Sequence, residues 1–155
     1  MSDLAVYDVV EKEKKQYIVV KIGGEHYGID ISYIDNIVRM SKITRVPKAP
    51  SYYRGVINLR GEVVPVMSLR RRMDLDDDEF TDASRIIILK LETGGLMGVI
   101  VDEVKEVITL DNTQIEKVTN DTTNDKVNFV QSVGKTNGGG LVSILDLSAV
   151  ATEKE

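Results

Sequence analysis

The sequence contains no cysteine, and it has one histidine and three prolines among 155 residues. Without cysteine the chain forms no disulfide and offers no thiolate to a zinc ion. The same absence fits a reducing compartment. His26 has no second histidine or cysteine with which to build a metal site or a proton-transfer pair. We therefore interpret His26 as an exposed residue at the end of a strand.

Long apolar runs are also missing. No window approaches the length of a transmembrane helix, and residues 1–16 lack the apolar stretch of a signal peptide. We therefore expect a cytoplasmic protein. Positive charge is in deficit as well, with 20 Lys and Arg against 25 Asp and Glu and a net charge of -5. This balance argues against nucleic-acid binding, which needs a basic face to neutralise phosphates.

The motifs of common enzymes are absent. The sequence has neither a G-x-S-x-G elbow nor a G-x-x-x-x-G-K-[ST] phosphate loop. The acidic run Asp74–Glu79 fails as a calcium loop, because Glu79 and Arg85 stand where Gly and Glu are required. We interpret this run as a solvated loop. Arg70–Arg72 are either a binding patch or the solvated face of a short helix. We expect no catalytic residues, no metal and no cofactor.

Short runs rich in Val and Ile are what the sequence does contain, and hydrophobic residues make up 42% of it. Such runs, separated by Gly-containing turns, predict hairpins. The Ile31–Val38 segment steps at near-helical spacing, which predicts a short helical turn within the sheet. Asp146 is the expected N-cap of a short C-terminal helix. The predicted strands are 17–22, 27–31, 56–59, 63–67, 85–91, 96–101, 127–133 and 141–145, with a short helix or turn at 69–73 and a surface loop at 74–84.

An internal repeat organises these elements. The apolar positions that follow Gly28 match those that follow Gly98, and Val63–Leu69 matches Leu141–Leu147. We interpret this as a duplication. It predicts one domain over 1–155 built from a first barrel near 16–70 and a second near 84–147, with a helix and tail at 148–155. Each half is too small to be very stable alone, and two packed halves leave a groove between them.

The most distinctive stretch is Gly55–Val66. Gly61 permits a tight turn, which places Arg60 where burial is disfavoured. Asn58 is positioned to bridge the turn backbone. Pro65 lacks an N–H group, so its strand is expected to be an edge strand or to carry a bulge.

This stretch resembles the signature of the CheW family of chemotaxis coupling proteins. Further segments resemble family elements in family order across residues 16–150: Tyr17–Val20, Tyr27–Ile31, Ile43–Pro47, Arg85–Ile88 and Gly98–Asp102. The resemblance implies a mainly β fold of two SH3-like five-stranded barrels with short helices. It also implies a stand-alone adaptor, with no receiver domain and no kinase domain.

The resemblance implies the partners as well. A CheW-type adaptor joins the cytoplasmic tip of chemoreceptors (methyl-accepting chemotaxis proteins) to the regulatory domain of the CheA histidine kinase, and it catalyses nothing. Recruitment to membrane-associated receptor arrays would follow, without membrane insertion. Positions that match the family's receptor-binding groove are Ile18, Ile31, Ile34, Ile37 and Val104. These five residues are alternatively plain core residues, and Ile18 and Ile31 are the most open to that interpretation.

Asn58 and Arg60 match the family's coupling residues, although Arg60 could instead bond a local carboxylate such as Glu62. Many relatives have Glu where this chain has Asn36, and Asp35 could substitute for it. A small barrel that binds a ligand or nucleic acid is the alternative function. Few aromatic residues and the negative charge oppose that alternative. An enzyme is disfavoured by the missing nucleophile and base.

Overall fold

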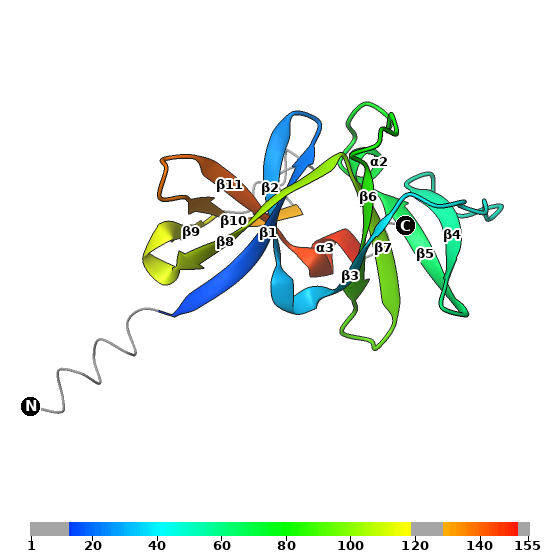
Figure 1. Cartoon of the computed structure of the whole chain (residues 1–155), viewed down its shortest axis with the longest axis horizontal. Coiled ribbons are helices and arrows are strands. Elements are labelled where there is room, and N and C mark those ends of the chain that lie inside the picture. The colour runs from blue at the N-terminus through cyan, green and yellow to red at the C-terminus, as the bar shows by residue number, and fades with distance from the viewer. Residues whose placement is uncertain (1–12, 119–128, 152–155) are drawn as a thin grey trace, which may run out of the picture. The chain divides into compact units, whose positions relative to one another are not determined.

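The structure is a computed structural model that describes residues 13–118 and 129–151. Within these residues the chain is mainly β, with two sheets and short helices (Figure 1). The predicted fold class is therefore confirmed. Residues 1–12, the first residues of the strand predicted at 127–133 and the end of the predicted tail lie outside the described residues.

One sheet has six strands in the order β8-β1-β2-β11-β10-β9, and the other has five in the order β3-β6-β7-β5-β4. The six-stranded sheet exceeds the expected five because both β8 and β9 join it. The elements are β1 (Lys14–Ile22), β2 (Glu25–Asp30), η1 (Ile31–Tyr33), β3 (Ile34–Arg39), β4 (Tyr53–Leu59), β5 (Glu62–Ser68), α2 (Leu69–Arg72), β6 (Arg85–Lys90), β7 (Leu96–Val101), β8 (Glu103–Asp111), η2 (Asn112–Gln114), β9 (Ile115–Lys117), β10 (Val130–Lys135), β11 (Leu141–Leu145) and α3 (Leu147–Ala151).

Glycine-containing turns join the predicted hairpins β1–β2, β4–β5, β6–β7 and β10–β11. At the first turn both Gly23 and Gly24 have positive φ, which a side chain would disfavour. The Asp146 side chain accepts a hydrogen bond from the Ala149 N–H at 3.1 Å, so the predicted cap of the last helix is confirmed. The glycines of the turns and the capping aspartate therefore determine where these hairpins turn and where the last helix begins.

The short helical turn predicted within Ile31–Val38 is confirmed at its start, but the helical spacing does not continue through the segment. Only Ile31–Tyr33 form a single 3-10 turn, and β3 follows at once. The strand prevails because β3 pairs with β6 along its whole length. A short β-branched segment gains more from a ladder with a neighbouring strand than from an isolated helical turn.

The strand that contains Pro65 is internal, so the expectation of an edge strand is wrong. Val56 lies opposite Pro65, and its N–H and C=O bond to Thr44 on the other side of β4. The nitrogen of Pro65 consequently points away from β4. The pairing of β5 with β7 starts only at Val66. The missing N–H therefore lies where the β5–β7 ladder ends, and the bulge in this hairpin lies at Arg54 on β4 rather than at Pro65.

The repeat reappears in the strand pairing. Val66 pairs in parallel with Gly98, and Ile144 pairs in parallel with Gly28. These are equivalent positions of the two halves. A Cβ on Gly28 would lie 2.8 Å from the Ile144 side chain, and one on Gly98 would lie 2.7 Å from Ile86. Each end strand therefore pairs with a strand of the other half, at a glycine that allows close approach.

This exchange divides the chain into two compact units that are not linear halves. Among the described residues, the first unit combines 13–19, 26–31, 106–118 and 129–151, and the second combines 20–25 and 32–105. The predicted division at 16–70 and 84–147 followed sequence order. Each unit instead contains segments from both halves of the repeat. The reason is that the parallel pairs β2–β11 and β5–β7 each join one strand of the first half to one strand of the second.

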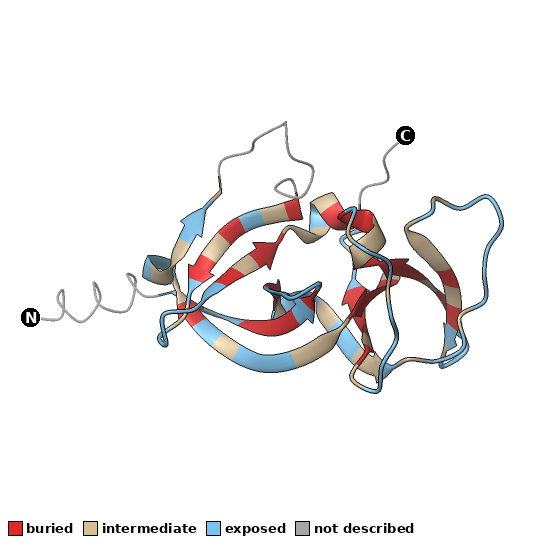
Figure 2. Ribbon diagram, turned by 90° about the horizontal axis from the view of Figure 1, so that it is seen from above, coloured by how far each residue is buried: buried red, intermediate tan, exposed pale blue. Residues whose placement is uncertain are grey.

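Each unit has an apolar core made by the inward faces of its strands (Figure 2). In the first unit Tyr17, Val19 and Leu110 pack with β11 residues Val142 and Ile144. The core of the second unit consists of Ile57, Val64, Val66, Ile86, Ile88 and Ile100. Burial of one such side chain contributes about 1.5–3 kcal/mol, so these clusters are the main stabilising element of each unit.

Candidate protein-binding site

The β4–β5 turn carries Arg60. Leu59 and Glu62 pair across the hairpin, leaving Arg60 and Gly61 as a two-residue loop. Both have positive φ, +51° at Arg60 and +84° at Gly61. This is the pattern of a type I′ turn, whose twist matches that of the flanking strands. The turn holds the Arg60 side chain outward with 69% of its surface exposed.

Asn58 fixes this turn from within. Its Oδ1 atom accepts a hydrogen bond from the Gly61 N–H at 3.0 Å. The predicted bridging role of Asn58 in the turn is therefore confirmed. Because this bond uses the side-chain oxygen of Asn58, its amide nitrogen is the group left to face solvent or a partner.

Arg60 pairs with Asp35 of β3 and not with Glu62, the local partner considered from the sequence. The Arg60 Nη2 atom lies 3.3 Å from Asp35 Oδ2. Glu62 is a neighbour in the hairpin, but β3 reaches the same turn because the five-stranded sheet curls. A bridge between Thr44 and Val56 likewise joins the segment after β3 to β4. An ion pair this exposed contributes roughly 0–1 kcal/mol, so Arg60 remains available to a partner.

A bulge in β3 presents Asp35 and Asn36 side by side. Ile34 pairs with Leu89 and Asn36 with Ile88, so Asp35 is the extra residue. The bulge interrupts the alternation of the strand, and both polar residues are exposed. Asn36 Oδ1 accepts a hydrogen bond from the Ile37 N–H at 2.8 Å. Asp35 supplies the carboxylate next to Arg60 that Asn36 cannot supply.

The five predicted groove residues differ in exposure. Ile18 is 5% exposed within β1, whereas Ile31 is 37% exposed in the 3-10 turn. Ile34 and Ile37 of β3 and Val104 of β8 are half-buried. The second unit holds Ile34, Ile37 and Val104 together with the Arg60 turn, while Ile18 and Ile31 belong to the first unit. A single groove formed by all five stays a prediction.

Two charged networks were not predicted from the sequence. Arg70 makes a two-bond contact with Asp102, Nε to Oδ1 at 3.0 Å and Nη2 to Oδ2 at 2.7 Å. Asp102 also accepts from the Gly23 N–H at 2.9 Å. Burial raises the pKa of Asp102, but the Arg70 guanidinium and the Gly23 amide outweigh it, so that the pKa lies below its ordinary value.

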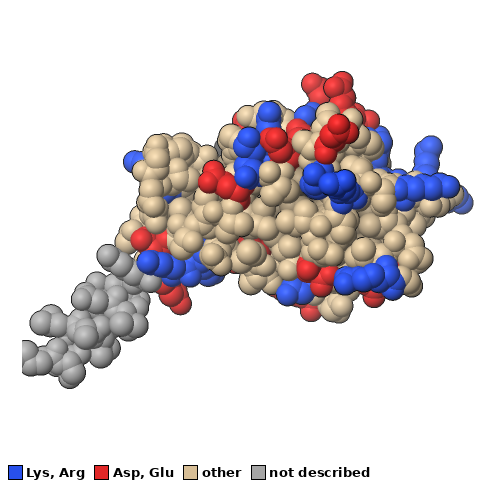
Figure 3. Space-filling view, viewed as in Figure 1, with Lys and Arg blue, Asp and Glu red and all other residues tan. Residues whose placement is uncertain are grey.

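The second network joins Arg54 and Arg71 to the acidic loop. Arg71 bonds Asp77 through two nitrogens at 2.8 and 2.9 Å, and these bonds hold the pKa of Asp77 below its ordinary value. Asp78 is nearly buried and accepts from the Ser68 hydroxyl at 2.5 Å and from Arg54. Figure 3 shows acidic and basic side chains intermingled over the part of the molecule that carries α2.

These networks correct the interpretation of both charge runs. The acidic run is not simply solvated, because Asp77 and Asp78 pair with arginines. Arg70–Arg72 are neither a free patch nor a solvated face, and Arg72 is 8% exposed with its guanidinium over the Tyr52 ring. The succession of three arginines and several aspartates within ten residues was the available signal. It indicates local neutralisation across one loop.

Within the part of the chain that the structure describes, no group of three or more His, Cys, Asp or Glu residues is placed to hold a metal ion. Likewise, none of the described helices has the length and hydropathy needed to cross a membrane. The outward-facing Arg60 turn lies beside the β3 bulge, and the partly exposed Ile34 and Ile37 flank that bulge.

The described residues therefore present a mainly β fold with an exposed arginine on the β4–β5 turn. Residues 16–155 match the family model for the CheW-like domain. The chain belongs to this family of chemotaxis adaptor and scaffold proteins.

The similarity to named relatives extends along most of the chain. It is 37% identical over 139 residues to the chemotaxis protein CheW of Bacillus subtilis, covering 90% of this chain and 88% of the relative. It is 34% identical over 139 residues to CheW of Helicobacter pylori, covering 90% and 82%. The crystal structure of the scaffolding protein TtCheW from Thermoanaerobacter tengcongensis is similar with a TM-score of 0.79 and 35% identity, covering 86% of this chain and 90% of that one.

Proposed function

We propose that this chain is a non-catalytic adaptor that couples the cytoplasmic tips of chemoreceptors to a CheA histidine kinase. The family match over residues 16–155 carries this proposal. The named relatives support it, because the chain covers at least four-fifths of the lengths of those cited above. Its location would be the cytoplasmic face of receptor arrays, reached by binding the receptor and not by inserting into the membrane.

The receptor tip, a helical hairpin, would place an apolar stripe on the exposed or half-buried aliphatic residues. Ile31, Ile34, Ile37 and Val104 retain accessible surface for such a contact. A helix with apolar residues at i, i+3, i+4 and i+7 can cover a surface of this kind. Ile18 has little surface left to offer, so it would act by supporting its neighbours in β1.

Arg60 and Asn58 would form the coupling element beside this surface. The turn fixes the Arg60 backbone, and its exposed pair with Asp35 is weak enough to be exchanged for a partner carboxylate. Asp35 would tune this exchange because it pairs with Arg60, and Asn36 lies next to it at the β3 bulge.

The proposal is tested by co-sedimentation of the purified chain with a receptor cytoplasmic fragment and a CheA kinase. We expect all three to sediment together. Ile31→Asp should weaken receptor binding roughly tenfold or more, because it puts a charge into an apolar contact. Leu141→Asp is the matched control, since Leu141 is also an exposed aliphatic residue, at 67%. Equal receptor binding by the two variants would remove Ile31 from the surface.

Arg60→Ala separates binding from coupling. The variant should fold normally, because the pair it loses is exposed. We expect it to join the assembly but to leave kinase autophosphorylation unstimulated. Full stimulation would exclude Arg60 from coupling, and failure of the wild-type chain to sediment with either partner would reject the proposed function.

A further inference from the structure

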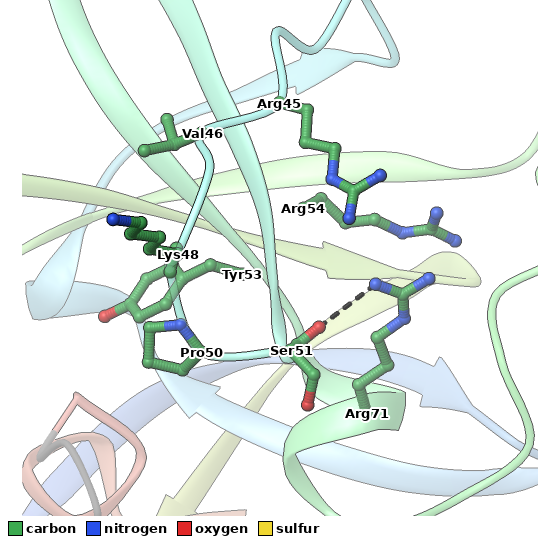
Figure 4. A pocket seen from close by; sticks show the side chains of 9 residues that line it. Arg45, Val46, Lys48, Pro50, Ser51, Tyr53, Arg54 and Arg71 are labelled. Carbon is green, nitrogen blue, oxygen red and sulfur yellow. Dashed lines mark hydrogen bonds between the residues drawn. The ribbon is translucent and has the colours of Figure 1, made fainter.

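A basic pocket opens in the second unit, beside the segment between β3 and β4 (Figure 4). Its volume is about 330 Å³. Arg45, Lys48, Arg54 and Arg71 line it, and Pro50 and Tyr53 give it an apolar wall. No acidic residue lines it. None of the residues proposed above for receptor binding or coupling belongs to it.

Two of these arginines are held in place by the chain itself. Arg54 is the extra residue of the β4 bulge, and its guanidinium lies 4.8 Å from the centre of the Phe80 ring. Arg71 is fixed by Asp77 and by a 3.0 Å hydrogen bond to the Ser51 carbonyl, which Figure 4 shows. Both guanidiniums are therefore ordered before any ligand arrives, which lowers the entropy cost of binding.

The other two cations have no carboxylate partner among the described residues. Arg45 and Lys48 are exposed, and neither makes an ion pair there. In Figure 3 basic side chains extend without acidic neighbours from the place where Figure 1 draws the cyan loop between β3 and β4. Lys48 has a φ of +66°, unusual for a side-chain-bearing residue, in a segment that Pro47 and Pro50 stiffen. The four cations of the lining therefore outnumber the two carboxylates, Asp77 and Asp78, that pair with Arg54 and Arg71.

We propose that this pocket binds an acidic peptide segment of a protein partner. One of its carboxylates would bind Arg45 beside the other arginines, another would bind Lys48 on the opposite side of the pocket, and an apolar residue between them would pack on Pro50 and Tyr53. The chain's own loop shows this mode of binding, because Asp77 already bonds Arg71 through both oxygens. The inference does not depend on which proteins the adaptor joins.

The chemistry favours a peptide over a phosphate group. The lining residues include no glycine, so there is no glycine-rich loop of backbone N–H groups to surround a phosphate. An apolar wall next to guanidiniums suits a chain that alternates acidic and apolar side chains. Because the protein carries a net charge of -5, binding of a polyanion at this place would have to come from the local cluster.

The test is an NMR titration of the full isotope-labelled chain with poly-L-glutamate at low salt, monitored on backbone amides. We expect the largest shifts at residues 45–54 and at Arg71, and weakening of binding as sodium chloride is added. The double variant Arg45→Glu with Lys48→Glu should bind roughly tenfold more weakly or worse. Lys90→Glu with Lys117→Glu is the control, since it changes the net charge equally at exposed sites elsewhere.

Separate titrations with inorganic phosphate and with phosphatidylglycerol vesicles distinguish the ligand classes. Absence of poly-L-glutamate binding, or equal weakening by both double variants, would overturn the proposal. Shifts at residues 45–54 caused by phosphate or vesicles but not by poly-L-glutamate would overturn the peptide assignment. Normal co-sedimentation with receptor and kinase in the same preparation would show that the proposed function stands regardless.

Discussion

Gly55 occupies a position in β4 where the backbone of another segment comes very close. Its φ is +144°, and a Cβ there would lie 2.1 Å from the Thr44 carbonyl oxygen. The next residue, Val56, makes both bonds of the bridge to Thr44 at 2.8 Å. A side chain at residue 55 would therefore force β4 and the Thr44 segment apart.

We predict that Gly55→Ala destabilises the protein by about 3 kcal/mol or more, from steric overlap with backbone and an unfavourable φ. Urea unfolding followed by circular dichroism measures the change. Gly95→Ala is the control, because Gly95 has open space around its Cβ position and no positive φ. A Gly55→Ala midpoint equal to that of Gly95→Ala would mean that β4 and the Thr44 segment separate at little cost.

At the scale of elements, the Arg70–Asp102 contact joins three segments. Arg70 lies on α2, Asp102 connects β7 to β8, and the Gly23 amide comes from the β1–β2 turn. The backbone N–H of Asp102 also donates to the Lys21 carbonyl at 2.9 Å. Both charged side chains are less than a quarter exposed, so water replaces this contact only partly when one partner is removed.

We predict that Arg70→Ala lowers the free energy of unfolding by about 1–3 kcal/mol, since it leaves Asp102 partly buried without its cation. Lys105→Ala provides the control, because the Lys105–Glu103 pair is more exposed, at 42% and 38%, and should cost under about 0.5 kcal/mol. Chemical unfolding at neutral pH compares the two variants. Equal costs would show that Arg70 contributes no more than a surface ion pair.

The same contact has a pH signature. The pKa of Asp102 is lower in the folded than in the unfolded chain, so its contribution is full above the ordinary value of 3.8 and is lost as pH falls through the folded pKa. Asp77 contributes in the same direction but is mostly exposed. Stability measured from about pH 6 to about pH 2 should fall less steeply in Arg70→Ala than in the parent chain. Parallel curves would contradict this.

The hairpins could be predicted from sequence because each depends on a local turn and two adjacent apolar runs. Gly61 and Asn58 indicated the β4–β5 turn, and the structure places the predicted bond there. The Asp35 partner of Arg60 lies 25 residues away, and the Asp102 partner of Arg70 lies 32 residues away. Contacts at such separations depend on how a sheet curls, which the local pattern does not specify.

At the scale of the whole molecule, the two halves of the repeat are interdependent. The parallel pairs β5–β7 and β2–β11 each take one strand from either half. The boundary between the units also falls inside β1 and β8. Neither half contains a complete set of partners for its own strands.

We predict that fragments 1–83 and 84–155 are each unfolded in isolation, because each has edge strands without partners and too small a core. Amide dispersion in NMR spectra of the separate fragments tests this. Mixing the two should restore the dispersion of the intact chain at sufficient concentration. A fragment that gives a dispersed spectrum alone would show that a half of the repeat is an autonomous barrel.

The left-handed backbone at Arg60 has one last consequence. An L-residue with a side chain carries a penalty of roughly 1 kcal/mol at such a φ, which glycine or asparagine would reduce. An Arg60→Gly chain is therefore expected to melt at or above the temperature of the parent. Backbone conformational preference alone would favour glycine or asparagine at residue 60. The arginine side chain is therefore present despite its unfavourable effect on the stability of the turn.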